Sequence, residues 1–194
     1  MRYFTKEMWA AAQKADAASD NHVKWDQAVK EYRLQLEQVR PRLSAAAFAF
    51  FAEADVHDGE FLDLKIVDGS RPSPVTERPR PWKSDVRFPV RVELTVLDAY
   101  DKLIWKLSYS SLRRTLVDFP SSEPLFYSPG DGFSDWGYHE LTDAGDGFLR
   151  HEVLFATGAT LLFEFQGIEV SNRPRPDDDA QPPAATDAPH AARR

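Results

Sequence analysis

Alternation of apolar and polar residues predicts β-strands through the last two-thirds of the chain. The longest example covers residues 86–96, where every even-numbered position is Val, Phe or Leu and most residues between them are polar. Because successive side chains of a strand point to opposite faces, this spacing places one face of the strand in a core. Related patterns predict six further strands, over residues 61–67, 103–109, 112–119, 136–142, 149–156 and 159–167.

Helical periodicity is confined to the N-terminal part. Thr5 is placed to cap a helix that runs from Lys6 to about residue 18, and Asp20 or Asn21 to cap a second. In this second helix apolar residues recur every three or four positions as far as Val39. Residues 43–53 are rich in Ala and Phe and predict a third, more buried helix. The sequence therefore predicts an α+β fold, with N-terminal helices packed on a mostly antiparallel sheet of about seven strands.

Two proline-rich segments, residues 70–85 and 120–134, interrupt the predicted strands and are interpreted as loops. From Asn172 onward Pro, Ala, Asp and Arg dominate without large apolar residues, which predicts a disordered tail over residues 172–194. The remaining residues, 1–171, are predicted to form one domain, with a helical part (1–54) and a β part (60–171).

The charge and the apolar content of the chain narrow the classes of molecule that it could bind. The net charge is −7, and the four Arg of the predicted tail balance its four Asp, so the excess acid belongs to the folded part. Nucleic acid is therefore a poor partner, because phosphate binding requires a basic face. The longest small apolar run, residues 45–52, is too short for a membrane helix of roughly twenty residues, and no secretory signal opens the chain. We expect a cytoplasmic location and no membrane association.

Three histidines followed by an acid are the candidate metal ligands, because the chain has no cysteine. Neighbours on a strand point to opposite faces, so neither the His139–Glu140 nor the His151–Glu152 doublet can serve one ion by itself. The third doublet is His57–Asp58, in the turn before the first strand, where the Asp-Gly pair also suits a plain turn.

Strand register brings two of these histidines together. A hairpin symmetric about Gly145 would place His139 directly opposite His151, with Cβ atoms about 5 Å apart. A three-residue loop at residues 157–159 would then pair Val153 with Phe163, whereas a two-residue loop would set His151 against a glutamate. The three-residue loop gathers the apolar residues on one face, and we prefer it. It puts His151 on the core face, which favours a structural role over zinc or manganese binding.

Aromatic residues in the proline-rich loops are the candidate binding residues. They are Trp82 in the first loop and Phe126, Tyr127 and Phe133 in the second. Large aromatics in loops are typical of interaction sites, although the same residues can also fold under a loop and cover the sheet.

Three segments carry a family resemblance. The opening MRYFTKE (residues 1–7), VHDGEFLDL (56–64) and the end pattern WGYHEL followed by HEVLFATGATLLFEFQGIEV resemble a bacterial family of uncharacterised proteins that open with Met, Lys or Arg, then Tyr-Phe-Thr-Lys. The resemblance covers most of residues 1–171. It implies no activity and no catalytic residues.

The sequence favours a non-enzymatic, cytoplasmic protein-binding module of the immunity or regulatory type, without a cofactor. The alternative is a metal-dependent hydrolase that uses His139 and His151, with His57 or Asp58 as the third ligand. A small-ligand carrier, with Phe48, Phe51 and Trp105 lining a pocket between helices and sheet, is a third hypothesis.

Overall fold

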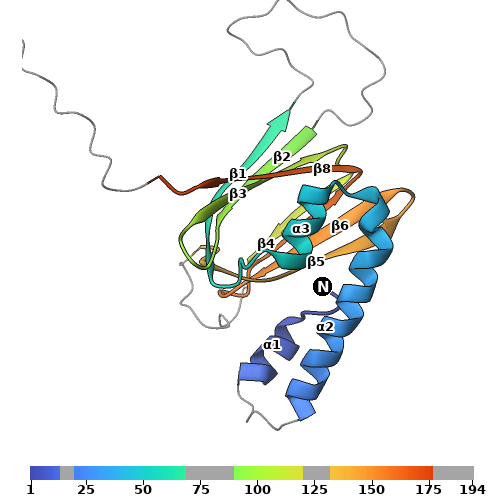
Figure 1. Cartoon of the computed structure of the whole chain (residues 1–194), viewed down its shortest axis with the longest axis vertical. Helices are drawn as coiled ribbons and strands as arrows, with labels where there is room; N and C mark the ends of the chain where they lie inside the picture. The colour runs from blue at the N-terminus through green and yellow to red at the C-terminus, as the bar shows by residue number, and fades with distance from the viewer. Residues whose placement is uncertain (14–19, 69–89, 120–131, 177–194) are drawn as a thin grey trace, which may run out of the picture.

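The chain is described here from a computed structural model, over residues 1–13, 20–68, 90–119 and 132–176. Within these residues the helices are α1 (Lys6–Gln13), α2 (Asp20–Val39) and α3 (Ala45–Glu53), and a short 3-10 helix at Arg40–Arg42 precedes α3 (Figure 1). The predicted cap is confirmed, because the hydroxyl of Thr5 accepts a hydrogen bond from the N–H of Met8 at 3.3 Å. Ser44 caps α3 in the same way, accepting from the N–H of Ala47 at 3.2 Å.

The β part of the described residues is an eight-stranded antiparallel sheet in the order β4-β7-β6-β5-β1-β2-β3-β8. The α+β fold with N-terminal helices on an antiparallel sheet is therefore confirmed. The strands are β1 (Gly59–Asp68), β2 (Val90–Leu97), β3 (Leu103–Ser110), β4 (Arg114–Asp118), β5 (Asp135–Gly145), β6 (Phe148–Phe155), β7 (Thr160–Phe165) and β8 (Gly167–Pro174).

The sheet curves so that its two end strands, β4 and β8, come together. In sequence β4 follows β3, the neighbour of β8, and β8 follows β7, the neighbour of β4. β3 runs through a short corner into β4, and β7 runs directly into β8. The two bent segments pair with each other on both sides of the corner: Ser110 lies opposite Gly167, and Arg114 lies opposite Glu164. On the other side of the molecule β1 meets β5 through two pairs, Gly59 with Trp136 and Glu60 with Asp135. The pairing therefore forms a closed circuit around one core.

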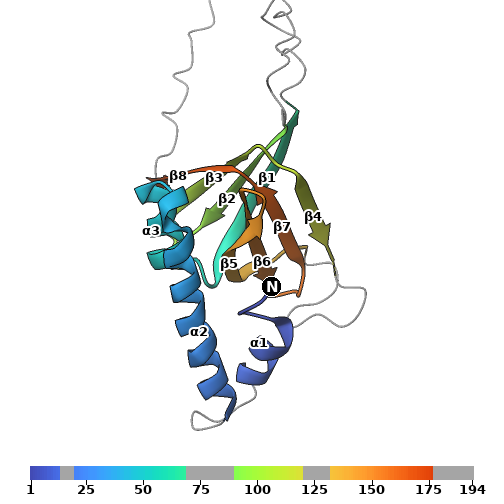
Figure 2. The ribbon, with the colours of Figure 1, turned by 90° about the vertical axis from the view of Figure 1, so that its right-hand side faces the viewer.

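The core lies inside this circuit. Its fully buried side chains come from both halves of the sheet and from α3: Phe50, Val92, Leu94, Val96, Leu107, Tyr109, Trp136, Val153, Phe155, Leu161, Phe163 and Phe165. The even-numbered face predicted for residues 92–96 is thus confirmed. Figure 1 shows α3 lying across the open side of the curved sheet, where Phe50 and Phe51 enter the core. α1 and α2 project beyond the sheet, with α2 passing β5 (Figure 2).

Two sequence predictions about the C-terminal end are wrong. The structure has an eighth strand, β8, and residues 172–174, which were assigned to the tail, belong to it. β8 was missed because it follows β7 after one residue, and its only large apolar residues are Ile168 and Val170. It is held by a complete ladder to β3, from Ser110 opposite Gly167 to Leu103 opposite Pro174. The predicted loop at 70–85, residues 86–89 of the predicted long strand, most of the loop at 120–134 and residues 177–194 lie outside the described residues.

None of the helices in the described ranges combines the length and the apolar character that crossing a membrane requires.

Gly59, in the two-pair contact between β1 and β5, is expected to be sensitive to substitution. A Cβ atom added at Gly59 would lie 2.9 Å from the carbonyl oxygen of Val56 and closer still to that of Leu97, and both are backbone atoms. We expect Gly59→Ala to lower the free energy of unfolding by about 1–3 kcal/mol, as overpacking does in cores. Urea denaturation would measure this. Glu60→Ala, at the exposed neighbouring position, is the control, and equal losses in the two variants would contradict the prediction.

Candidate functional site

The two histidines of the predicted pair meet in the core. His139 on β5 and His151 on β6 both face inward, and Nδ1 of His139 lies 3.3 Å from Nε2 of His151. On its other side, Nδ1 of His151 lies 2.6 Å from the hydroxyl of Tyr109, which comes from β3 across the core. The rings of Phe51 and Trp136 enclose the pair, with centroids 4.9 to 6.1 Å from the histidine rings. His151 is completely buried.

Burial fixes the protonation of this cluster. It lowers the pKa of His139 to about 4 and that of His151 well below its usual value, while it raises the pKa of the Tyr109 hydroxyl well above its own. All three groups are therefore neutral near pH 7. Two directions of this hydrogen-bond chain are possible with neutral rings. If the Tyr109 hydroxyl donates to Nδ1 of His151, then Nε2–H of His151 donates to Nδ1 of His139. In the reverse direction Nε2 of His139 keeps a lone pair.

The registers that predicted this meeting are each wrong by two residues. His139 lies opposite Val153, and His151 lies opposite Leu141, because the β5–β6 hairpin turns at Asp146–Gly147 and not at Gly145. In the next hairpin His151, not Val153, lies opposite Phe163. A shift of two residues leaves every side chain on its predicted face. The histidines therefore share the core face and touch diagonally.

His57 and Asp58 lie on the other side of β5. Nδ1–H of His57 donates to the carbonyl of Gly137 at 2.8 Å, and its ring stacks on Tyr138 with centroids 4.5 Å apart. Tyr138 faces the helices, whereas its neighbour His139 faces the core. Asp58 adopts a positive φ of 64° in the turn that opens β1. The structure therefore does not bring these two residues to the histidine pair. Within the described residues no three His, Cys, Asp or Glu side chains gather as a metal-binding group.

A buried carboxylate on the outer face of β5 was missed by the sequence reasoning. Glu140 has an exposed fraction of 0%, and its oxygens accept hydrogen bonds from the backbone N–H groups of Arg2, Tyr3 and Phe4. The Tyr3 and Phe4 bonds are 2.8 and 3.3 Å long. Glu152, directly opposite in the ladder, pairs with the Met1 ammonium at 2.8 Å. Both glutamates follow a histidine in the sequence, but the N-terminal groups that they bind lie more than 130 residues away, so sequence spacing does not reveal the contacts.

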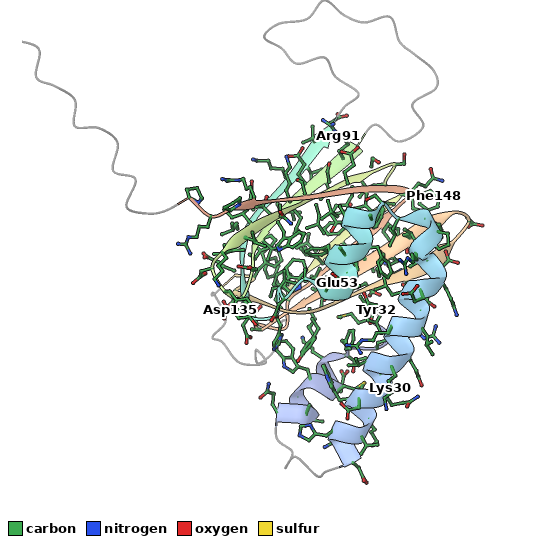
Figure 3. All side chains as sticks on the ribbon, viewed as in Figure 1. Lys30, Tyr32, Glu53, Arg91, Asp135 and Phe148 are labelled. Atoms are coloured by element: carbon green, nitrogen blue, oxygen red, sulfur yellow. The ribbon has the colours of Figure 1, made fainter. Side chains whose placement is uncertain are left out.

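This carboxylate fastens the helical part to the sheet. With residues 2–4 held by Glu140, the ring of Phe4 stacks on Tyr138 and packs edge-on against Tyr32 of α2. Figure 3 shows Tyr32 projecting from α2. Its hydroxyl accepts a hydrogen bond from the N–H of Leu141 on β5 at 3.2 Å. Glu140 therefore positions the N-terminal segment against β5.

The pocket predicted for a small-ligand carrier is filled by packing. Phe51 is buried against both histidines, and Phe48 and Trp105 pack against the core. The structure instead has an open cleft of about 400 Å³ outside the sheet, between the N-terminal segment and α2, with Arg2, Lys24 and Glu31 among its lining residues.

Of the four predicted binding aromatics, only Phe133 lies among the described residues. Its ring contacts Phe61, Phe119 and Phe155, with centroids 4.6 to 4.9 Å apart, so it covers one end of the core. Trp82, Phe126 and Tyr127 lie outside the described residues.

Exposed apolar side chains lie in β4 and directly after it. Eight large apolar residues of the described ranges are exposed. Leu116 (43%) and Val117 (39%) lie in β4, and Phe119 (52%) follows it, while β1 carries two others, Leu62 and Ile66. Among the described strands β4 pairs with β7 alone, so no described strand covers its second edge. Figure 2 shows β4 as an outermost strand, on the side away from α3. The alternation at residues 112–119 predicted this strand but not its exposed edge.

None of the known family models, curated proteins and solved structures compared with this chain matches it. The resemblance to the family that opens with Tyr-Phe-Thr-Lys therefore stays a prediction.

The neutral histidines make stability depend on pH. The pKa of His139 is about 4 in the folded protein, below its ordinary value of 6.5, so the unfolded chain binds more protons between these values. The contribution of the neutral ring is complete above about pH 6.5 and is lost as the pH falls toward 4. We expect this residue to remove about 2 kcal/mol of the free energy of unfolding between about pH 7.5 and about pH 5.

Urea denaturation across this pH range, with His139→Gln and His139→Phe, checks the expectation. Both variants should show a flatter pH dependence than the wild type, whatever their stability at pH 7. His139→Phe removes the titrating ring but keeps the aromatic packing. Two variants with the wild-type slope would show that His139 does not cause the pH dependence.

The hydrogen bonds of Glu140 lead to a second prediction about stability. Glu140→Gln keeps the shape of the side chain but turns one acceptor oxygen into a donor and removes the charge. We expect a loss of about 2 kcal/mol in the free energy of unfolding, together with faster hydrogen exchange of the amides of residues 2–4. Glu169→Gln, at an exposed position on β8, is the control and should change stability by less than about 0.5 kcal/mol. Unchanged exchange in Glu140→Gln would contradict the positioning role.

Proposed function

We propose that this chain is a non-enzymatic protein-binding module, of the immunity or regulatory type, that docks a polypeptide along the free edge of β4. The single observation that carries the proposal is that an edge of β4 covered by no described strand coincides with exposed Leu116 and Val117, and with Phe119 directly after the strand. An unpaired edge offers backbone N–H and C=O groups to an incoming strand, and apolar side chains beside it add contact area.

The position of the predicted binding aromatics supports the same edge. Phe119, directly after β4, contacts Phe133 at 4.9 Å between ring centroids. Phe126 and Tyr127 belong to the segment that joins these two residues in sequence. Phe133, one of the predicted binding aromatics, therefore lies beside the residue that follows β4, and large aromatic side chains are enriched at interaction hot spots.

The burial and hydrogen bonding of the candidate catalytic side chains also support a binding role. His139 and His151 meet on the inner face of the sheet, Glu140 lies buried on the outer face of β5, and each is hydrogen-bonded to other parts of this chain. A catalytic group needs access to a substrate, whereas His151 and Glu140 are completely buried and His139 is half-buried against Phe51 and Trp136.

Site-specific photo-crosslinking in cells tests the proposal. A benzophenone amino acid at position 116 should form adducts with a polypeptide, which mass spectrometry of the adduct would identify. The matched control is position 66 on β1, where Ile66 is exposed (62%) and away from β4. No polypeptide adduct at 116, or equal adducts at 116 and 66, would overturn the docking edge.

A further inference from the structure

We propose that the polypeptide taken up by β4 is a second copy of this chain, paired antiparallel through β4 about a two-fold axis at Leu116. This inference rests on the docking edge of the proposed function and names its partner. Two copies related by a two-fold axis present the same strand to each other, so the pairing closes as a dimer and leaves the β4 edges of both copies covered.

The charges of β4 fit this pairing. The strand reads Arg-Thr-Leu-Val-Asp over residues 114–118. In the antiparallel register centred on Leu116, Arg114 of each copy lies opposite Asp118 of the other, so two ion pairs form across the dimer. Opposite charges directly across a ladder stabilise it, and like charges destabilise it. A parallel pairing in register would instead place Arg114 opposite Arg114, so the charges select the antiparallel arrangement.

Both charged residues are available for this role. Arg114 and Asp118 are exposed, and neither takes part in an ion pair between described residues. Glu164, the residue opposite Arg114 on β7, is already held by Arg113 and Arg150 at 2.7 Å each. Asp118 lies opposite Thr160, which carries no charge. No ion pair between described residues therefore neutralises the charges at the two ends of β4.

The apolar residues fit as well. Leu116 would face its own copy at the axis, and Thr115 would face Val117. Residues opposite each other in an antiparallel pair have Cβ atoms about 5 Å apart, close enough for these side chains to bury one another. Leu162 lies beside Leu116 on β7 and extends the apolar row in each copy. Since a five-residue strand makes a small interface, we expect a dimer that depends on concentration.

Sedimentation equilibrium of the purified full chain tests the pairing. The weight-average mass should rise from 22.0 kDa toward twice that value as concentration increases. Asp118→Arg places like charges opposite each other twice, and we expect it to raise the dissociation constant about tenfold or more. The double variant Arg114→Asp with Asp118→Arg exchanges the charges and should restore the dimer. Leu116→Lys brings two ammonium groups together at the axis and should give a monomer.

Glu169→Arg is the matched control, because it reverses an exposed charge on β8, the strand at the other end of the sheet order. It should dimerise like the wild type. A wild type that stays monomeric at every concentration, an Asp118→Arg variant that dimerises normally, or a double variant that fails to recover would each overturn the self-pairing. Far-UV circular dichroism checks that each variant is folded.

The photo-crosslinking experiment at position 116 distinguishes failure of self-pairing from failure of the proposed docking edge, on which this inference rests. Adducts at position 116 between two copies of the chain support self-pairing. Adducts with a different polypeptide alone would overturn self-pairing and keep the docking edge, whereas the absence of any adduct would overturn both.

Discussion

The paired ladder of β3–β4 with β7–β8 bends at a corner where one strand has an extra residue. Three residues lie between Ser110 and Arg114, while two lie between Glu164 and Gly167. An extra residue on one strand of an antiparallel pair bends and twists that strand. Ser111 takes a positive φ of 53° there, and the space beside Gly167 is occupied by the hydroxyl of Ser110. The bend turns an open sheet into a closed circuit, and both the core and the outer faces follow from it.

The closed circuit of strands determines the environment of the polar residues on its inner and outer faces. On the inner face, Tyr109 from one half of the sheet reaches His151 from the other half, so two imidazoles that would be exposed in a flat sheet become neutral core groups. On the outer face, the two-pair seam leaves most of β5 without a second strand. α2 and the N-terminal segment occupy that place, and Glu140 holds the segment through its backbone amides.

Periodicity predicted the helices, seven of the strands and the faces of the core, because these depend on neighbours within a few residues. The registers were wrong by two residues because they depend on the turns: Asp146, Gly147 and Gly158 take positive φ values that move both hairpin turns. The role of Glu140 and the strand β8 could not be found in this way. Each depends on a partner far along the chain, the N-terminal segment for Glu140 and β3 for β8.

The corner that closes the sheet also creates its exposed edge. β2 follows β3 up to the corner, where Val92 lies opposite Tyr109, but the described part of β2 does not continue beside β4. Exposed edges are commonly protected by lysine, proline or an inward charge, and residues 114–118 contain neither lysine nor proline. The charges of β4 have opposite signs at its two ends, which discourages most registers but permits the self-complementary one.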